Sequence, residues 1–278
     1  MTSEWRTGLL ALDLDGTVLT PDLQIDPRDI AAVGRAQAAG MTVVVCTGRP
    51  FPGALSWAKR LGLKRALICY QGAQVRSPDG EMLLDRGLEH DVAMEIVRFC
   101  RQRDLHVQAY RNDELIVERD REEGRNYARH AGMPIHIVPD LDQAMGATTP
   151  KMVIIAQPPV IEELLPEVRT RWEGRIYAAT SSTTYLEITS PGADKRAGLS
   201  FLCERLGIPR ERTVAVGDGR NDQPMIEWAA LGVAMGTAPP EVVASAHGHS
   251  IGAAGTGAIA RLIAGLLGEA PMPWEEAA

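Results

Sequence analysis

Two aspartates at the end of an apolar segment are the first residues of this sequence that could do chemistry. Asp13 and Asp15 follow the apolar run Leu9–Leu12 and precede a Gly-Thr pair. A buried parallel strand has a continuous apolar sequence, and side chains two positions apart point to the same side. We therefore expect both carboxylates to face the crevice that open α/β sheets form at the carboxyl ends of their strands.

Further polar segments stand where other predicted strands end or where a helix begins. If the core strands are parallel, these strand ends converge on the same crevice. The segments are Thr47-Gly48-Arg49 after one apolar run, Lys195 at the start of a helical pattern, and Gly217-Asp218-Gly219-Arg220-Asn221-Asp222 after another apolar run.

The chemistry that needs this set of side chains is phosphoryl transfer. Crowded carboxylates repel one another, and a divalent cation with oxygen ligands relieves the repulsion. The cation then attracts an anion, and a hydroxyl and a lysine add charge-assisted contacts to that anion. One carboxylate can act as the nucleophile and form an aspartyl-phosphate. A second, two residues on, can protonate the leaving group and later activate water.

Other interpretations of the acidic segments fit the residues less well. A calcium loop that opened at Asp13 would need glycine at its sixth position and glutamate at its twelfth, where this chain has Val18 and Gln24. A dinucleotide fingerprint at 217–222 would lack its third glycine, and Asp218 inside the turn would repel pyrophosphate. Asp13 and Asp15 could also be solvated turn residues, because most aspartates are exposed to solvent.

The composition is that of an acidic protein with ordinary polarity. The 278 residues carry a formal net charge of −7, and 45% of them are hydrophobic. This charge disfavours a nucleic-acid partner, and no apolar run reaches the ~18 residues that a membrane span needs. No apolar signal core precedes a cleavage site, so we expect cytoplasmic residence. The four cysteines lie far apart and are expected to be buried free thiols.

The order of the predicted elements divides the chain into a core and an insertion. Strands and helices alternate over residues 1–84, with a third strand at 66–69 and a hairpin after it, and the alternation resumes over 186–278. This rhythm is typical of a doubly wound parallel sheet. Residues 85–185 are predicted to form a separate α/β module with a mainly antiparallel sheet. We therefore expect an α/β fold in which a Rossmann-like core sheet carries an inserted domain.

The polar motifs resemble, in order and spacing, those of the haloacid dehalogenase (HAD) superfamily. The insertion after the third strand, and Met225 after the Asn-Asp pair, are similar to its Cof-type sugar-phosphatase branch. The resemblance covers nearly the whole chain and implies a HAD core with an inserted α/β cap domain. It is carried by Asp13-Leu14-Asp15-Gly16-Thr17, Thr47-Gly48-Arg49, Lys195 and Gly217-Asp218-Gly219-Arg220-Asn221-Asp222.

The resemblance also implies catalytic roles for individual residues. Asp13 would be the nucleophile and Asp15 the general acid/base. Thr47 and Lys195 would hold the transferring phosphoryl group, beside Gly48 of the same segment. Arg49 would either contact the phosphate or pair with a core carboxylate.

A magnesium site follows from the same resemblance. Mg²⁺ would lie between Asp13, the backbone carbonyl of Asp15 and Asp218, with Asn221 or Asp222 nearby. The cap would exclude water and recognise the leaving group. Within the cap, several side chains could face the substrate, although a solvated surface position is favoured for each: His106, Tyr110, Arg111, Glu114 and Arg125.

Two segments differ from the family pattern. Gln71-Gly72-Ala73 stands where the family often has Asn-Gly-Ala, and Gly236-Thr237-Ala238 stands in place of a later Gly-Asn-Ala. Both differences lie outside the four chemical motifs, so they bear on substrate positioning more than on catalysis.

These observations predict a Mg²⁺-dependent phosphatase that acts on a small phosphorylated metabolite, in the first instance a sugar phosphate. A phosphomutase on the same core is an alternative, because it uses similar residues. A non-catalytic regulator that binds a phosphorylated ligand is a second alternative, although a binding protein needs no nucleophile such as Asp13. The expected assembly is a monomer or a homodimer.

Overall fold

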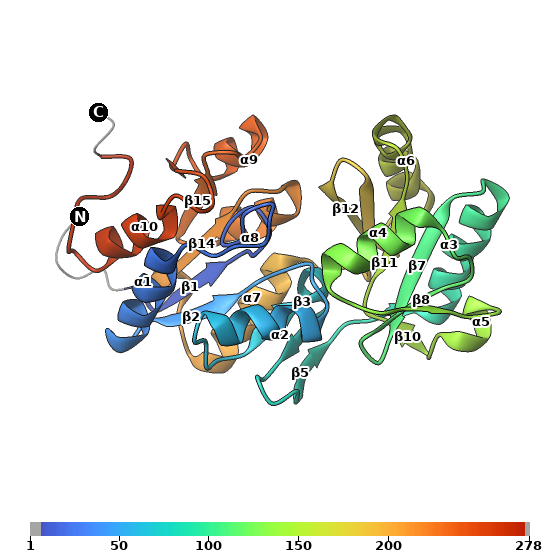
Figure 1. The fold of residues 1–278 in the computed structure, drawn as a ribbon, viewed down its shortest axis with the longest axis horizontal. Helices are drawn as coiled ribbons and strands as arrows, with labels where there is room; N and C mark the ends of the chain where they lie inside the picture. Colours follow the sequence, from blue (N-terminus) through green and yellow to red (C-terminus); the bar gives the residue numbers. More distant parts are fainter. Residues whose placement is uncertain (1–6, 276–278) are drawn as a thin grey trace.

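Residues 7–275 are described in a computed structural model, in which two lobes lie side by side (Figure 1). The first and last parts of the chain together form one lobe, and the middle of the chain forms the other. An α/β core with an inserted cap, as the sequence predicts, is therefore confirmed.

Five parallel strands form the core sheet, in the order β16-β15-β14-β1-β2. They are β1 (Leu9–Leu12), β2 (Thr42–Val45), β14 (Thr213–Gly217), β15 (Leu231–Met235) and β16 (Ser250–Ile251). In strand β1, which lies between β14 and β2, all four residues are fully buried. Leu12 is level with Val45 of β2 and with Val216 of β14. The carboxyl ends of these three strands therefore meet at one edge of the sheet.

Helices cover both faces of the core sheet. They are α1 (Pro27–Ala38), α2 (Phe51–Arg60), α7 (Lys195–Leu206), α8 (Gln223–Trp228), α9 (Pro240–Ser245) and α10 (Ala258–Leu266), with short 3₁₀ turns at Arg210–Arg212 and Arg220–Asp222. Because side chains alternate along a strand, Leu10 and Leu12 pack against α1, α2 and α10. Leu9 and Ala11 pack against α7, α8 and α9 on the other face. This two-sided cover explains why β1 has a continuous apolar sequence.

The third predicted core strand lies beside β2 and also belongs to a second sheet. Strand β3 (Leu67–Cys69) meets the parallel sheet through a parallel bridge between Cys46 and Ile68. It pairs antiparallel with β4 (Gln74–Arg76), which pairs with β5 (Met82–Asp85). Since the chain reverses tightly at Tyr70–Gly72, β3 links the edge of the core sheet to the hairpin sheet.

The inserted cap contains a six-stranded sheet in the order β12-β13-β11-β7-β8-β9. Its pairs are antiparallel except for the parallel pair β8–β9, and a small antiparallel pair β6–β10 lies beside it. The strands are β6 (Leu88–Glu89), β7 (His106–Arg111), β8 (Glu114–Val117), β9 (Ile135–Ile137), β10 (Thr148–Thr149), β11 (Met152–Ile155), β12 (Tyr177–Ser182) and β13 (Tyr185–Thr189).

Four helices accompany the cap sheet: α3 (His90–Gln102), α4 (Glu122–Ala131), α5 (Leu141–Ala144) and α6 (Pro158–Arg171). Helices α3 and α6 pack on one face of the sheet, where Phe99 of α3 and Trp172, which follows α6, meet edge to face with ring centroids 5.3 Å apart. The predicted division at 85–185 stays a prediction, and strand β13 carries the cap sheet on to Thr189.

A contact between two aromatic rings and several hydrogen bonds join the cap to the core beside the edge of the core sheet. The rings of Tyr70 in the core and Tyr110 in the cap meet edge to face, with centroids 5.3 Å apart. Asp113 of the cap accepts hydrogen bonds from the Tyr70 hydroxyl at 3.0 Å and from Arg76 at 2.7 Å. These contacts hold the cap over the ends of the core strands.

The structure also answers two expectations from composition. Within residues 7–275, no helix is long and apolar enough to cross a membrane. The four cysteines are all free and buried, as predicted.

Candidate active site

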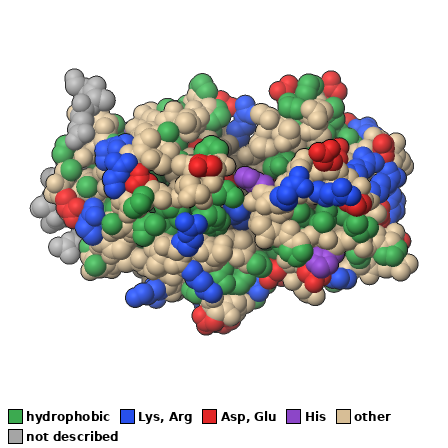
Figure 2. Space-filling model, viewed as in Figure 1, with side chains coloured by type: hydrophobic (Ala, Val, Ile, Leu, Met, Phe, Trp, Pro, Cys, Tyr) green, Lys and Arg blue, Asp and Glu red, His purple; other side chains and the backbone are tan. Residues whose placement is uncertain are grey.

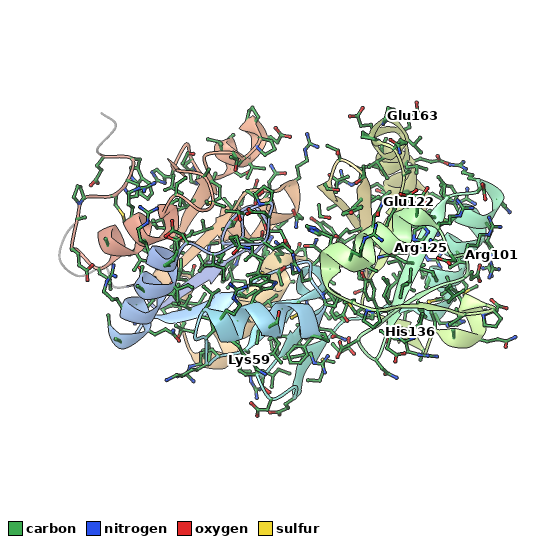
Figure 3. All side chains as sticks on the ribbon, in the orientation of Figure 1. Lys59, Arg101, Glu122, Arg125, His136 and Glu163 are labelled. Atoms are coloured by element: carbon green, nitrogen blue, oxygen red, sulfur yellow. The ribbon has the colours of Figure 1, made fainter. Side chains whose placement is uncertain are left out.

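The predicted chemical residues meet where the core strands end. Asp13 follows β1, Thr47 follows β2 and Asp218 follows β14, while Lys195 begins α7. Figure 2 shows the surface hollowed between the two lobes, and Figure 3 shows side chains of both lobes meeting there. A cavity of about 130 Å³ lies at this junction. The parallel register thus brings together residues that lie more than 200 positions apart.

Lys195 is the cation at the centre of the site, and its side chain is fully buried. Its Nζ lies 2.5 Å from Oδ1 of Asp13 and 2.5 Å from Oδ1 of Asp222. Burial disfavours the charged ammonium, but the two carboxylates outweigh that effect and hold the pKa of Lys195 well above its usual value. Lys195 therefore carries its positive charge between two buried carboxylates.

Three carboxylates form a cluster that could hold a metal ion. Asp13, Asp218 and Asp222 each offer an oxygen, and these oxygens lie within 4.8 Å of one another. Burial, and then repulsion from Asp222, raises the pKa of Asp218 to about 7. Burial also raises the pKa of Asp13, against the attraction of Lys195. A hard divalent cation such as Mg²⁺ takes oxygen ligands and would offset this repulsion, so the donor set fits the ion.

Hydrogen bonds and the close approach of one glycine position the cluster. Thr17 Oγ1 donates a hydrogen bond to Asp218 at 2.9 Å, and Oδ2 of Asp222 accepts from the backbone N–H of Gly219 at 2.8 Å. Gly16 has a φ of +83°, and a Cβ there would overlap the Asp218 carboxylate. Glycine is therefore required at this position in the turn after β1.

Asp15 does not join the acidic cluster, because its carboxylate pairs with Arg49. The guanidinium donates from Nε at 2.8 Å and from Nη2 at 2.6 Å. Arg49 is buried, whereas the side chain of Asp15 is 40% exposed at the mouth of the cavity. Nη1 of Arg49 also reaches the backbone carbonyl of His130 in the cap, at 3.4 Å. The structure thus contains the ion pair, and contact of Arg49 with a phosphate stays a prediction.

The remaining predicted residues line or support the same cavity. Thr47 is fully buried, and its hydroxyl accepts a hydrogen bond from the backbone N–H of Arg49 at 3.1 Å. Gly48 lines the cavity, and a Cβ there would collide with the side chain of Gln71. Asn221 also lines the cavity and donates from Nδ2 to Gln71 at 3.1 Å.

The cap side of the cavity contains residues that the sequence analysis did not select. Glu187 of β13 pairs with Lys151 at 2.9 Å, and both side chains are buried. The signal that could have drawn attention to them was a charged residue directly before the apolar strand β11 and another within β13. The cap residues that line the cavity are Tyr127, His130, Ala131, Ser181, Ser182, Tyr185 and Glu187.

The cap candidates named from sequence do not line this cavity. A surface position for His106 and Tyr110 is wrong, because both side chains are buried. Tyr110 instead donates a hydrogen bond to the Tyr127 hydroxyl at 2.7 Å. Both residues lie in β7, and the sequence pattern did not show which face of this strand is covered.

Comparison with known proteins places this geometry in a family. The sequence profile of the haloacid dehalogenase-like hydrolases matches residues 10–263. The 5-amino-6-(5-phospho-D-ribitylamino)uracil phosphatase of Bacillus subtilis is 28% identical, over 84% of this chain and 88% of its own. The HMP-PP phosphatase of Serratia proteamaculans is 27% identical, over 84% of this chain and 85% of its own.

Solved structures have the same fold. A haloacid dehalogenase-like hydrolase from Bacteroides thetaiotaomicron is 27% identical, covers 93% of this chain and 98% of its own, and superposes with a TM-score of 0.83. The subclass IIB sugar phosphatase BT4131 has a TM-score of 0.76 over 88% of this chain and 94% of its own, at 22% identity.

Proposed function

The chain belongs to the haloacid dehalogenase-like hydrolases and is a phosphatase of that family, and from this premise we propose that it hydrolyses a small sugar phosphate through an aspartyl-phosphate intermediate. The observation that carries the proposal is the buried contact of Lys195 with Asp13 beside the cluster of Asp218 and Asp222. The proposed nucleophile, a buried cation and the proposed metal ligands thus lie together, which supports this mechanism.

Asp13 is the proposed nucleophile. Lys195 holds its Oδ1, which leaves Oδ2 to attack the phosphorus atom. The bond between Asp13 and phosphorus forms as the bond from phosphorus to the leaving oxygen breaks, and Asp15 gives a proton to that oxygen. A water molecule then attacks the phosphorus and passes a proton to Asp15. This second step releases inorganic phosphate and restores the Asp13 carboxylate.

The position of Asp15 suits a group that must exchange protons with substrate and water. It lies at the mouth of the cavity, where its carboxylate is held by Arg49 on one side. Because Arg49 also reaches the cap backbone at His130, the orientation of Asp15 depends on the cap being in place. Thr47 and Lys195 are proposed to bind the transferring phosphoryl group.

Asp13, Asp218 and Asp222 are the proposed side-chain ligands of Mg²⁺, together with the backbone carbonyl of Asp15 and with Asn221 nearby. When bound, the ion supplies positive charge that offsets these carboxylates and the charge of the phosphoryl group. The Thr17 hydroxyl orients Asp218, and the backbone N–H of Gly219 orients Asp222.

A relative supports the choice of a phosphorylated polyol as the substrate. The phosphorylated ribityl chain in the name of the Bacillus subtilis relative supports a phosphorylated sugar or sugar alcohol. Cytoplasmic residence and a monomeric or homodimeric state stay predictions.

Release of phosphate from a panel of phosphorylated metabolites, measured with Mg²⁺ and with EDTA, tests the proposal. We expect release from one or a few sugar phosphates with Mg²⁺, loss of activity in EDTA, and recovery when Mg²⁺ is added back. Asp13→Asn should abolish turnover, because an amide of the same shape is a far weaker nucleophile, and its circular dichroism should match the wild type.

Three outcomes would contradict parts of this assignment. Substantial turnover by Asp13→Asn would exclude this nucleophile, and activity that survives EDTA would exclude the metal. Conversion of one sugar phosphate into another without net phosphate release would identify a phosphomutase.

A further inference from the structure

A buried ion pair of the cap reaches the floor of the cavity. Lys151 and Glu187 lie 2.9 Å apart, with side chains 1% and 6% exposed. Lys151 Nζ also donates a hydrogen bond to the backbone carbonyl of Gly48 at 2.7 Å. The pair therefore contacts the loop that follows β2 in the core. Removing a charge pair from water is costly, and such a pair persists where its geometry is well supported or where it has a use.

The Glu187 carboxylate is held by three donors and still has capacity for a ligand. Lys151 and Gln71 donate to Oε2, at 2.9 and 2.8 Å, and Ser181 donates to Oε1 at 2.6 Å. A carboxylate offers about four acceptor positions. Glu187 lines the cavity, so the remaining position is available to a hydrogen-bond donor of the substrate.

Gln71 ties this cap carboxylate to the metal side of the site. Its Nε2 donates to Glu187, and its Oε1 accepts from Asn221 at 3.1 Å. Its backbone is left-handed, with φ of 61° and ψ of 27°, and its N–H donates to the Thr47 carbonyl at 3.1 Å. A left-handed conformation is costly for a residue with a side chain, so this turn fixes the amide at the boundary of cap and core.

The cations around the cavity are already paired with protein carboxylates. Arg49 pairs with Asp15, Lys195 with Asp13 and Asp222, and Lys151 with Glu187. Among the described residues that line the cavity, His130 is the one other basic side chain, and it lies 3.9 Å from Asp15. A second anionic group on the leaving group would therefore meet Glu187 without a free lysine or arginine.

We propose that Glu187 selects the leaving group: it accepts a hydrogen bond from a hydroxyl of a neutral polyol and disfavours a leaving group that carries a second negative charge. Gln71 and Lys151 are positioning residues that orient its carboxylate. This inference rests on the proposed function, because it concerns the substrate of the same site.

The test compares kcat/KM for three esters with Mg²⁺: ribitol 5-phosphate, fructose 1,6-bisphosphate and p-nitrophenyl phosphate, whose leaving group has no further hydroxyl. The wild type should prefer ribitol 5-phosphate to p-nitrophenyl phosphate by about 10- to 100-fold, the usual worth of a hydrogen bond to a charged acceptor. It should also prefer ribitol 5-phosphate to the bisphosphate.

Two variants of the cavity and one control complete the test. Glu187→Gln should lower the ratio of kcat/KM for ribitol 5-phosphate to kcat/KM for p-nitrophenyl phosphate by about tenfold or more. It should also bring kcat/KM for the bisphosphate closer to that for ribitol 5-phosphate. Gln71→Asn, whose shorter amide cannot span Glu187 and Asn221, should change both ratios in the same direction and by less. Glu163→Gln, on the cap surface away from the core (Figure 3), should leave them unchanged.

The outcomes separate this inference from the function on which it rests. A wild type that hydrolyses none of the esters overturns the proposed function and this inference with it. A wild type that hydrolyses p-nitrophenyl phosphate but shows no preference for the polyol overturns the inference alone. The same holds if Glu187→Gln and Gln71→Asn both fold, by circular dichroism, and keep the wild-type ratios.

Discussion

Replacement of Lys195 by methionine tests whether its charge holds the acidic site together. Methionine is flexible and fills most of the space of lysine, so the change removes the charge and two hydrogen bonds and keeps much of the packing. In the wild type, the buried Nζ lies 2.5 Å from both Asp13 and Asp222. The variant leaves these two carboxylates without a cation.

The expected loss of unfolding free energy is about 3–5 kcal/mol in EDTA, because breaking a buried pair strands its charged partner. The loss should depend on pH. Burial raises the folded pKa of Asp13 above its value in the unfolded chain. The folded state therefore binds the extra proton, and the stability that is present at low pH is lost as the pH rises through the folded pKa. Without Lys195 the folded pKa of Asp13 rises further. The variant's loss of unfolding free energy should therefore be larger at pH 8 than at pH 5.

Urea unfolding in EDTA at the two pH values provides the measurement, with Lys59→Met as the control. Lys59 lies on the outer surface of α2 (Figure 3) and is exposed, so its replacement should change stability by less than about 0.5 kcal/mol. A loss below about 1 kcal/mol for Lys195→Met, or a loss equal to that of the control, would refute the account of Lys195 as the cation that the site requires.

Two further predictions concern Asp15 and His106. Asp15→Asn should lower kcat by roughly 10²–10⁴-fold, because an amide cannot exchange the proton with the leaving group or with water; a rate within threefold of the wild type would remove Asp15 from this role. Burial lowers the pKa of His106 below the value of about 6.5 in an unfolded chain. The unfolded state then binds the extra proton, so stability present above pH 6.5 is lost as the pH falls through the folded pKa. The melting temperature should fall more steeply from pH 7.5 to pH 5 in the wild type than in His106→Gln, and equal slopes would disprove the assignment.

The sequence was sufficient to predict the core because local pattern and chemistry agree there. A continuous apolar run such as Leu9–Leu12 favours burial, and the polar residues that follow such runs stand at the strand ends, which a parallel sheet brings together. Asp13, Lys195 and Asp218 could therefore be placed together without knowledge of the structure. Gly16 was included in the motif, but its close approach to Asp218 is evident only in the folded structure.

The cap could not be predicted in the same detail because its contacts depend on register between antiparallel strands. Lys151 and Glu187 are 36 residues apart and meet only because β11 pairs with β13. The burial of His106 depends on α4, whose Gly124 packs directly against that ring. Whether Arg49 pairs with a core carboxylate is likewise decided by the three-dimensional arrangement of the two loops that carry Asp15 and Arg49.

The insertion of the cap between the halves of the core also affects how the chain folds during synthesis. Leu9 of β1 pairs with Thr213 of β14, about 200 residues later. At about 5–20 residues per second, the ribosome needs roughly 10 to 40 s to deliver that partner. Throughout this time the apolar strands β1 and β2 lack one side of their sheet, and they are candidates for chaperone binding. The cap strands are complete by Thr189, so the nascent chain is able to fold the cap before it completes the core around β1.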